Sequence, residues 1–185
     1  MEIEPEKTED KRLNSLVAIT VVIVSVFLAI SKLKDDNIVR QMAFIKADSV
    51  DVWNEYQAER IKLHADENAL RALSLSAPHN AQDFAAEKSR LEDAIARYKS
   101  QSDTLKAKAA ETDLRYKKFE ERHDQFDIED AVLSITLALT GVAALTELYW
   151  LLATGWGFAA FGIFMGLAGI FQWPVHPEFL ANLLG

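Results

Sequence analysis

LNSLVAITVVIVSVFLAIS, residues 13–31, is an apolar segment without a single charged side chain. An uncharged apolar run of about 18 or more residues can cross the hydrocarbon core of a bilayer as a helix. The run is long for a signal peptide, and no small-residue cleavage site precedes Lys32. We therefore expect an uncleaved first span at residues 13–33, preceded by a disordered polar segment at residues 1–12.

Charge is segregated along the rest of the chain. Residues 32–130 hold 17 Lys and Arg and 21 Asp and Glu, whereas only Glu147 and Glu178 are charged beyond them. This pattern predicts a second span at 131–147 and a third at 150–173, and it excludes a single soluble domain. Residues 174–185 are expected to form an interfacial foot.

Composition excludes several classes of function. The chain of 185 residues has no cysteine, which rules out disulfides, cysteine zinc sites, cysteine nucleophiles and iron–sulfur clusters. Its net charge of -8 argues against nucleic acid as a partner, because nucleic acid binding requires a basic face.

Residues 34–130 are predicted to form a helical hairpin. This segment has no Gly and a single Pro, Pro78, and helix-forming residues dominate it. We expect the turn at residues 76–80, with Asn80 as the N-cap of the second helix and Asp83 in its first turn. A short turn makes the two helices antiparallel neighbours. The predicted fold is therefore all-α, with three transmembrane helices and a long antiparallel coiled-coil hairpin between spans one and two.

Both hairpin helices carry a stripe of residues spaced alternately by three and four, which we call the seam. This spacing is typical of coiled coils because it keeps one face of a helix toward a partner. On the first helix the seam comprises Ile38, Met42, Ile45, Ser49, Val52, Tyr56, Glu59, Leu63, Asp66, Leu70 and Leu73. On the second helix it comprises Phe84, Lys88, Leu91, Ile95, Tyr98, Ser102, Leu105, Ala109, Thr112, Tyr116, Phe119, His123 and Phe126.

The position of the turn predicts the register of the hairpin. Folding the chain at the turn pairs seam residues whose numbers sum to about 157. In this register polar seam residues also find partners, with Glu59 beside Tyr98 and Asp35 beside His123. That agreement between pattern and pairing supports the register.

Several short motifs follow one another in the order of a known pattern. They are DVWNEYQAERIK at 51–62, IARY at 95–98, HDQF at 123–126 and Leu145-Thr146 before Trp150. They resemble the W-x-x-Y-Q-A-x-x-I-K signature and later motifs of bacterial domain-of-unknown-function family 4337, over roughly residues 11–171. The resemblance implies one span, a helical hairpin and two closing spans. Because the family's activity is uncharacterised, it implies no catalytic residue.

One pair of residues resembles half of a metal site. Glu120 and His123 form a Glu-x-x-His pair, the unit that di-iron bundles use twice. The reversed pair of His64 and Glu67 lies about 45 Å away along the hairpin, so the two pairs cannot share one site. We therefore expect no metal and no cofactor. His123 is instead expected to bond a carboxylate such as Asp35.

Small and aromatic residues mark expected packing positions. Gly162, Gly166 and Gly169 form a small-residue stripe on the third span, which allows close contact with a span of the same chain or of another subunit. Tyr56 lies on the seam and Trp53 at its edge, where it could also face a neighbouring chain.

The turn between the second and third spans has two alternatives. Thr154-Gly155 has the better turn chemistry, but that choice puts Glu147 inside the bilayer. Turning at residues 147–150 leaves the carboxylate at the surface, and we adopt this alternative. The expected interfacial anchors are Tyr149, Trp150 and Trp173.

The orientation in the membrane is decided by the family pattern. Near the first span the bases are tied, with Lys11 and Arg12 on one side and Lys32 and Lys34 on the other. Family members carry basic residues before the Trp, which implies a cytoplasmic second turn, although this chain has Glu147-Leu148-Tyr149 there. We expect a multi-pass protein of the bacterial inner membrane, with a cytoplasmic N-terminus and a periplasmic hairpin.

The sequence contains no phosphate loop, nucleophile elbow, zinc-protease motif or dinucleotide fingerprint. We therefore expect a non-enzymatic scaffold or accessory subunit of a membrane assembly. Its partners would be the lipid bilayer and either further copies or other membrane-protein subunits. A transport or channel component formed by an oligomer is the first alternative, and a metal-dependent enzyme at the base of the hairpin is the second.

Overall fold

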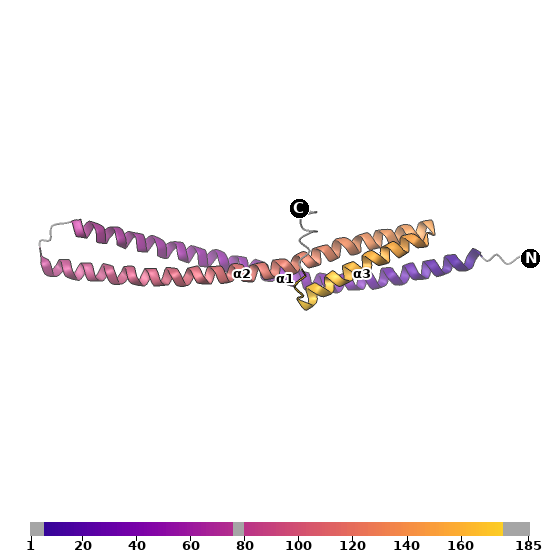
Figure 1. Cartoon of the computed structure of the whole chain (residues 1–185), viewed down its shortest axis with the longest axis horizontal. Helices are drawn as coiled ribbons and strands as arrows, with labels where there is room; N and C mark the ends of the chain where they lie inside the picture. The colour runs from indigo at the N-terminus through magenta and orange to yellow at the C-terminus, as the bar shows by residue number, and fades with distance from the viewer. Residues whose placement is uncertain (1–5, 76–79, 176–185) are drawn as a thin grey trace, which may run out of the picture. The chain divides into compact units, whose positions relative to one another are not determined.

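The structure is a computed structural model that describes residues 6–75 and 80–175. These residues form three helices and no strand: α1 (Glu6–Leu75), α2 (Ala81–Thr146) and α3 (Tyr149–Phe171) (Figure 1). The predicted all-α class is therefore confirmed. Each helix contains a segment that is long and apolar enough to cross a membrane.

Helix α1 begins at Glu6, so residues 6–12, which were expected to be disordered, are helical. The physical reason is that no Gly or Pro separates this polar segment from the apolar one. Extending an existing helix by a few residues needs no new nucleation step. Residues 1–5 lie outside the described part of the chain.

The start of α2 is capped as the sequence predicts. The Asn80 side-chain carbonyl accepts a hydrogen bond from the backbone N–H of Gln82 at 2.9 Å, and its amide donates to Asp83 at 2.9 Å. The N–H groups of the first helical turn lack helical partners, and this cap satisfies one of them. Residues 76–79 of the predicted turn lie outside the described residues.

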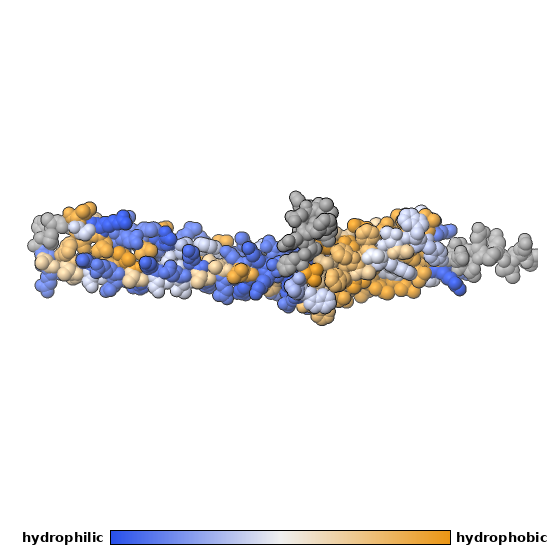
Figure 2. Space-filling view, viewed as in Figure 1, coloured by the Kyte–Doolittle hydropathy of each residue, from blue (hydrophilic) through white to orange (hydrophobic). Residues whose placement is uncertain are grey.

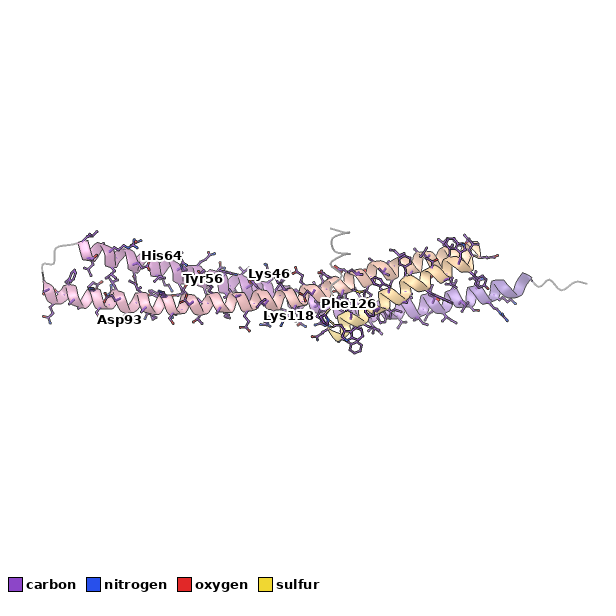
Figure 3. The ribbon with its side chains drawn as sticks, viewed as in Figure 1. Lys46, Tyr56, His64, Asp93, Lys118 and Phe126 are labelled. Atoms are coloured by element: carbon purple, nitrogen blue, oxygen red, sulfur yellow. The ribbon has the colours of Figure 1, made fainter. Side chains whose placement is uncertain are left out.

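The chain divides into two compact units, which are described separately. The two-helix unit is Met42–Lys117, and the three-helix unit combines Met1–Gln41 with Lys118–Gly185. Figure 3 shows Tyr56 and His64 on α1 and Asp93 on α2 of the two-helix unit. Figure 2 shows that apolar residues gather on the three-helix unit and hydrophilic residues on the two-helix unit.

Within the two-helix unit, α1 and α2 are joined by polar contacts. Ser49 Oγ donates a hydrogen bond to Asp113 Oδ1 at 3.1 Å, and Lys46 Nζ lies 5.5 Å from the centre of the Tyr116 ring. The numbers of each of these pairs sum to 162, whereas those of Lys62 and Tyr98 sum to 160, and those of Leu73 and Phe84, which line one hollow, sum to 157. The contacts of this unit therefore agree with the predicted register to within about one and a half helical turns.

The seam positions form the less exposed face of both helices. The most buried apolar seam residues of this unit are Ile45, Val52, Leu63, Leu91 and Ala109. Among the seam residues of the two-helix unit, Lys88 alone is classed as exposed. The periodicity therefore identifies the packed face, although it does not fix the register.

The three-helix unit has its core between all three helices. One cluster joins Leu13 of α1, Ala143 of α2 and Leu152 of α3, and a second joins Val24, Leu133 and Ala159. A hydrogen bond of 2.9 Å from Trp156 Nε1 to Thr20 Oγ1 links α3 to α1.

Helices α2 and α3 are separated by two residues, Glu147 and Leu148. Glu147 has a φ of 55°, in the left-handed region, and the Leu151 N–H bonds the Leu148 carbonyl at 3.1 Å. Thr154 and Gly155, the alternative turn, lie inside α3. The third helix ends at Phe171, and residues 176–185 of the expected foot lie outside the described part.

Candidate functional site

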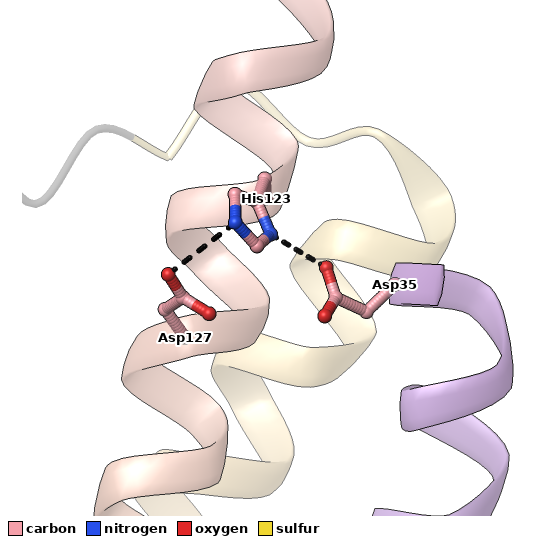
Figure 4. Close-up of side chains that lie close together, drawn as sticks. All are labelled: Asp35, His123 and Asp127. Carbon is pink, nitrogen blue, oxygen red and sulfur yellow. Dashed lines mark hydrogen bonds and ion pairs between the residues drawn. The ribbon is translucent and has the colours of Figure 1, made fainter. Parts of the chain in front are cut away.

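A histidine of the three-helix unit lies between two carboxylates (Figure 4). His123 Nδ1 is 2.6 Å from Oδ1 of Asp35 on α1, and its Nε2 is 3.6 Å from Oδ2 of Asp127, one turn further along α2. A neutral imidazole can donate from one nitrogen only, whereas the protonated ring donates from both. His123 therefore hydrogen-bonds Asp35, and Asp127 lies near its other ring nitrogen, beyond hydrogen-bond distance.

Asp35 contacts charged or polar groups on both helices of this group. It is buried, and its second oxygen, Oδ2, accepts a hydrogen bond of 3.1 Å from Lys32 Nζ. A buried carboxylate is stabilised only when charged or polar groups satisfy it. Lys32 and His123 do so from opposite helices, so Asp35 ties α1 to α2.

A second buried carboxylate lies nearby without such partners. Glu129 is 1% exposed, and neither of its carboxylate oxygens has a hydrogen-bond partner among the described residues. The Oγ of Ser31 on α1 is also buried and has no hydrogen-bond partner among the described residues. Both residues line a cavity of about 20 Å³, together with Asp35, Asp127 and Asp130.

Glycines of α3 make room for this part of α2. A Cβ added at Gly166 would overlap the Glu129 carboxylate, and one added at Gly169 would approach the Phe126 ring to 2.9 Å. One added at Gly162 would lie 2.6 Å from a methyl group of Leu133. The predicted glycine stripe therefore packs against α2 of its own chain.

The chain after α3 is tied to α2 by polar side chains. Gln125 donates from Nε2 to the carbonyls of Trp173 and Val175, at 3.1 and 2.8 Å. Arg122 donates to the carbonyl of Gly169 at 3.3 Å, and partial burial lowers the pKa of its guanidinium. The Arg122 bond satisfies a carbonyl in the last turn of α3, which has no helical partner, and the Gln125 bonds hold the chain that follows the helix.

The other predicted site residues lie apart from this group. Glu120 is exposed, and the set of possible metal ligands that the described residues bring together is Asp35, His123 and Asp127. Trp53 and Tyr56 contact each other edge to face, with ring centres 5.4 Å apart.

Glu59 and Tyr98 are connected through a lysine. Lys62 Nζ bonds Glu59 at 2.7 Å and lies 5.7 Å from the centre of the Tyr98 ring. Of the expected interfacial anchors, Tyr149 and Trp150 are exposed at the start of α3, and Trp173 stacks on Phe171 after its end.

Ser31 and Glu129 were missed by sequence reasoning, and the seam spacing holds a signal for Ser31 alone. Ser31 lies four residues before Asp35, and Glu129 lies three residues after Phe126. Continuing the first seam back from Ile38 by steps of three and four reaches Asp35 and then Ser31. The same spacing takes the second seam from Phe126 to the exposed Asp130, so it does not identify Glu129.

Comparisons with known proteins return one match. The family model described as Domain of unknown function (DUF4337) matches residues 13–172, which confirms the resemblance seen in the motifs. No curated protein and no solved structure matches the chain.

Proposed function

We propose that this chain, which belongs to the DUF4337 family, is a non-enzymatic scaffold or accessory subunit of a membrane assembly. In this proposal the three-helix unit crosses the bilayer. The two-helix unit is an antiparallel hairpin outside the bilayer that contacts partner subunits.

The apolar exterior of the three-helix unit is the observation that carries the proposal. Five β-branched residues of α1 are each more than half exposed: Ile19, Val22, Ile23, Val26 and Ile30. Aromatic residues of α3 are also exposed, namely Trp156, Phe158, Phe161 and Phe164. Exposed apolar surface of this extent needs an apolar covering. Lipid can provide it, because a helix satisfies its own backbone hydrogen bonds.

The interior of this unit supports the same interpretation. Thr20, Thr136 and Thr140 are buried between the helices and hydrogen-bond to groups of the chain itself. Small and polar residues inside with large apolar residues outside are typical of helices packed in a membrane.

A stripe on the two-helix unit supports a role in assembly. Val50, Trp53 and Ile61 are apolar, exposed and on one side of α1, because they follow at intervals of three and eight residues. This side is distinct from the seam, so a further copy or another subunit could cover it.

We propose the bacterial inner membrane as the location, with the N-terminus in the cytoplasm and the hairpin in the periplasm. The basic second turn of family members supports this orientation.

Native mass spectrometry after mild detergent extraction tests the scaffold role. We expect an assembly of more than one chain or subunit, which a Val50→Ser, Ile61→Ser double variant dissociates. Phe44→Ser is the matched control, because Phe44 is exposed but lies about 120° around α1 from Val50. A monomeric wild type, or an equal effect of the control, would exclude this surface as the contact.

A component of a transporter is the second candidate, and the buried Glu129 favours it. Acidic residues inside membrane bundles often mark ion or proton pathways. Cation flux into proteoliposomes that is lost in Glu129→Gln would support transport. Flux equal to that of empty liposomes would exclude it for the isolated chain.

A further inference from the structure

The cavity beside Glu129 differs from the other hollows of the described chain in its size and lining. Its volume of about 20 Å³ exceeds the roughly 10–15 Å³ that one water molecule needs. It therefore has room for a single water or a single ion. Its polar lining comes from α1 and α2, within the three-helix unit.

Two groups of the lining lack partners. Ser31 Oγ and both oxygens of Glu129 are fully shielded and have no well-formed hydrogen bond to a described residue, although Ser31 lies close enough to Glu129 to stabilise its carboxylate. Glu129 cannot withdraw toward α3, because Gly166 lies against its carboxylate. A shielded carboxylate without a partner is strongly unfavourable, so Glu129 is relieved either by a proton or by an occupant of the cavity that neutralises it.

The charge around the cavity identifies the kind of occupant. Four carboxylates line it, those of Asp35, Asp127, Glu129 and Asp130, together with one ammonium, that of Lys32. With all four carboxylates ionised and both Lys32 and His123 charged, two negative charges would remain for an occupant to compensate. All of the anionic and neutral polar groups in the lining would bind a cation through oxygen atoms, the ligands that hard cations prefer.

We propose that this cavity binds one divalent hard cation of the Mg²⁺ or Ca²⁺ class, with Glu129 and Ser31 as ligands from α2 and α1. Asp127 and Asp130, which are exposed, complete the oxygen ligands at the cavity mouth. The site does not depend on the scaffold role, since its residues all belong to the three-helix unit.

His123 and Lys32 are positioning residues in this site. Both oxygens of Asp35 are occupied by these two side chains, which hold Asp35 at the cavity wall. His123 also lies 3.6 Å from Asp127, a proposed ligand, and groups that orient a metal ligand typically change metal affinity by about 10- to 100-fold. If His123 only joined the two helices, His123→Gln would leave the metal affinity unchanged.

The test uses the full chain in detergent micelles after treatment with a chelator, with Mn²⁺ as the probe. Electron paramagnetic resonance should detect one bound Mn²⁺ per chain, displaced by excess Mg²⁺ or Ca²⁺. Glu129→Gln should weaken Mn²⁺ binding at least tenfold, because it removes the charged ligand and keeps the shape. Glu120→Gln is the matched control, an exposed glutamate of the same helix, and should bind as the wild type does.

A thermal melt separates loss of the site from loss of the fold. In the wild type the melting temperature should rise with added Mg²⁺ or Ca²⁺, and in Glu129→Gln this rise should vanish while the ion-free protein stays at least as stable. If Glu129→Gln does not fold, Ser31→Ala takes its place and should weaken Mn²⁺ binding several-fold. No Mn²⁺ bound by the wild type, or equal affinity in the folded site variant, would overturn the proposal and leave a water or a proton in the cavity.

Discussion

His123 Nδ1 lies 2.6 Å from Asp35 Oδ1, and this contact joins helices α1 and α2 across 88 residues of sequence. The carboxylate side chain is 4% exposed and the histidine side chain 28%. We expect His123→Ala to lower the free energy of unfolding by about 1.5–3 kcal/mol, the usual value of a hydrogen bond to a charged group.

An exposed pair provides the control for this prediction. His64 and Glu67 lie 3.0 Å apart on α1, with side chains 55% and 38% exposed. His64→Ala should therefore change stability by no more than about 0.5 kcal/mol. Denaturant unfolding in mixed micelles measures both variants, and equal losses would contradict a special role for the Asp35 contact.

The glycines of α3 should not tolerate a side chain. We expect Gly162→Ala and Gly169→Ala to destabilise the three-helix unit by about 1–3 kcal/mol, because the new methyl groups would overlap Leu133 and Phe126. Gly141→Ala is the matched control, since a Cβ there meets nothing within 4 Å, and alanine should stabilise that helix by up to about 1 kcal/mol. Thermal melts that rank Gly141→Ala with the other two would refute the close packing.

Cysteine crosslinking tests the register of the two-helix unit. A Ser49→Cys, Asp113→Cys pair should form a disulfide, because the parent side chains hydrogen-bond at 3.1 Å. Positions 49 and 108 match the register that the turn predicts, and cysteines there should react poorly. Position 108 lies five residues before Asp113 on α2, a distance of about 7.5 Å along the helix. Faster crosslinking of 49 to 108 would restore the predicted register.

Maleimide labelling tests the proposed orientation. A cysteine at the exposed Ser89 should react with an impermeant maleimide once the outer membrane is opened. A cysteine at Thr146, next to the turn between α2 and α3, should react only after the inner membrane is broken. The opposite order of labelling would place the hairpin in the cytoplasm.

Much of the fold follows from the sequence because charge and periodicity are strong signals. The uncharged run at 13–31 and the absence of Gly and Pro within 80–130 predict long helices, and the structure has them. The axial register of the two helices is harder to predict, because a seam of repeated apolar residues constrains the face of each helix more than its axial position.

The candidate site was only half visible in the sequence. The pairing of Asp35 with His123 follows from the seams, and the structure has that contact. Glu129 and Ser31 were not identified, because the charged section and the apolar section were treated as separate elements. A residue at the boundary of the two belongs to the packing of both.

The central claim is that the apolar exterior of the three-helix unit faces lipid while the two-helix unit faces water. Spin labels on four exposed valine and isoleucine positions of α1 test it in nanodiscs: Val22, Val26, Val50 and Ile61. All four parent side chains are β-branched and apolar, so local chemistry does not distinguish them. We expect labels at 22 and 26 to be accessible to oxygen and protected from a water-soluble nickel complex. Labels at 50 and 61 should show the reverse in nanodiscs that hold a single chain, where no partner subunit covers them. Nickel access at positions 22 and 26 equal to that at 61 would contradict the membrane-spanning arrangement.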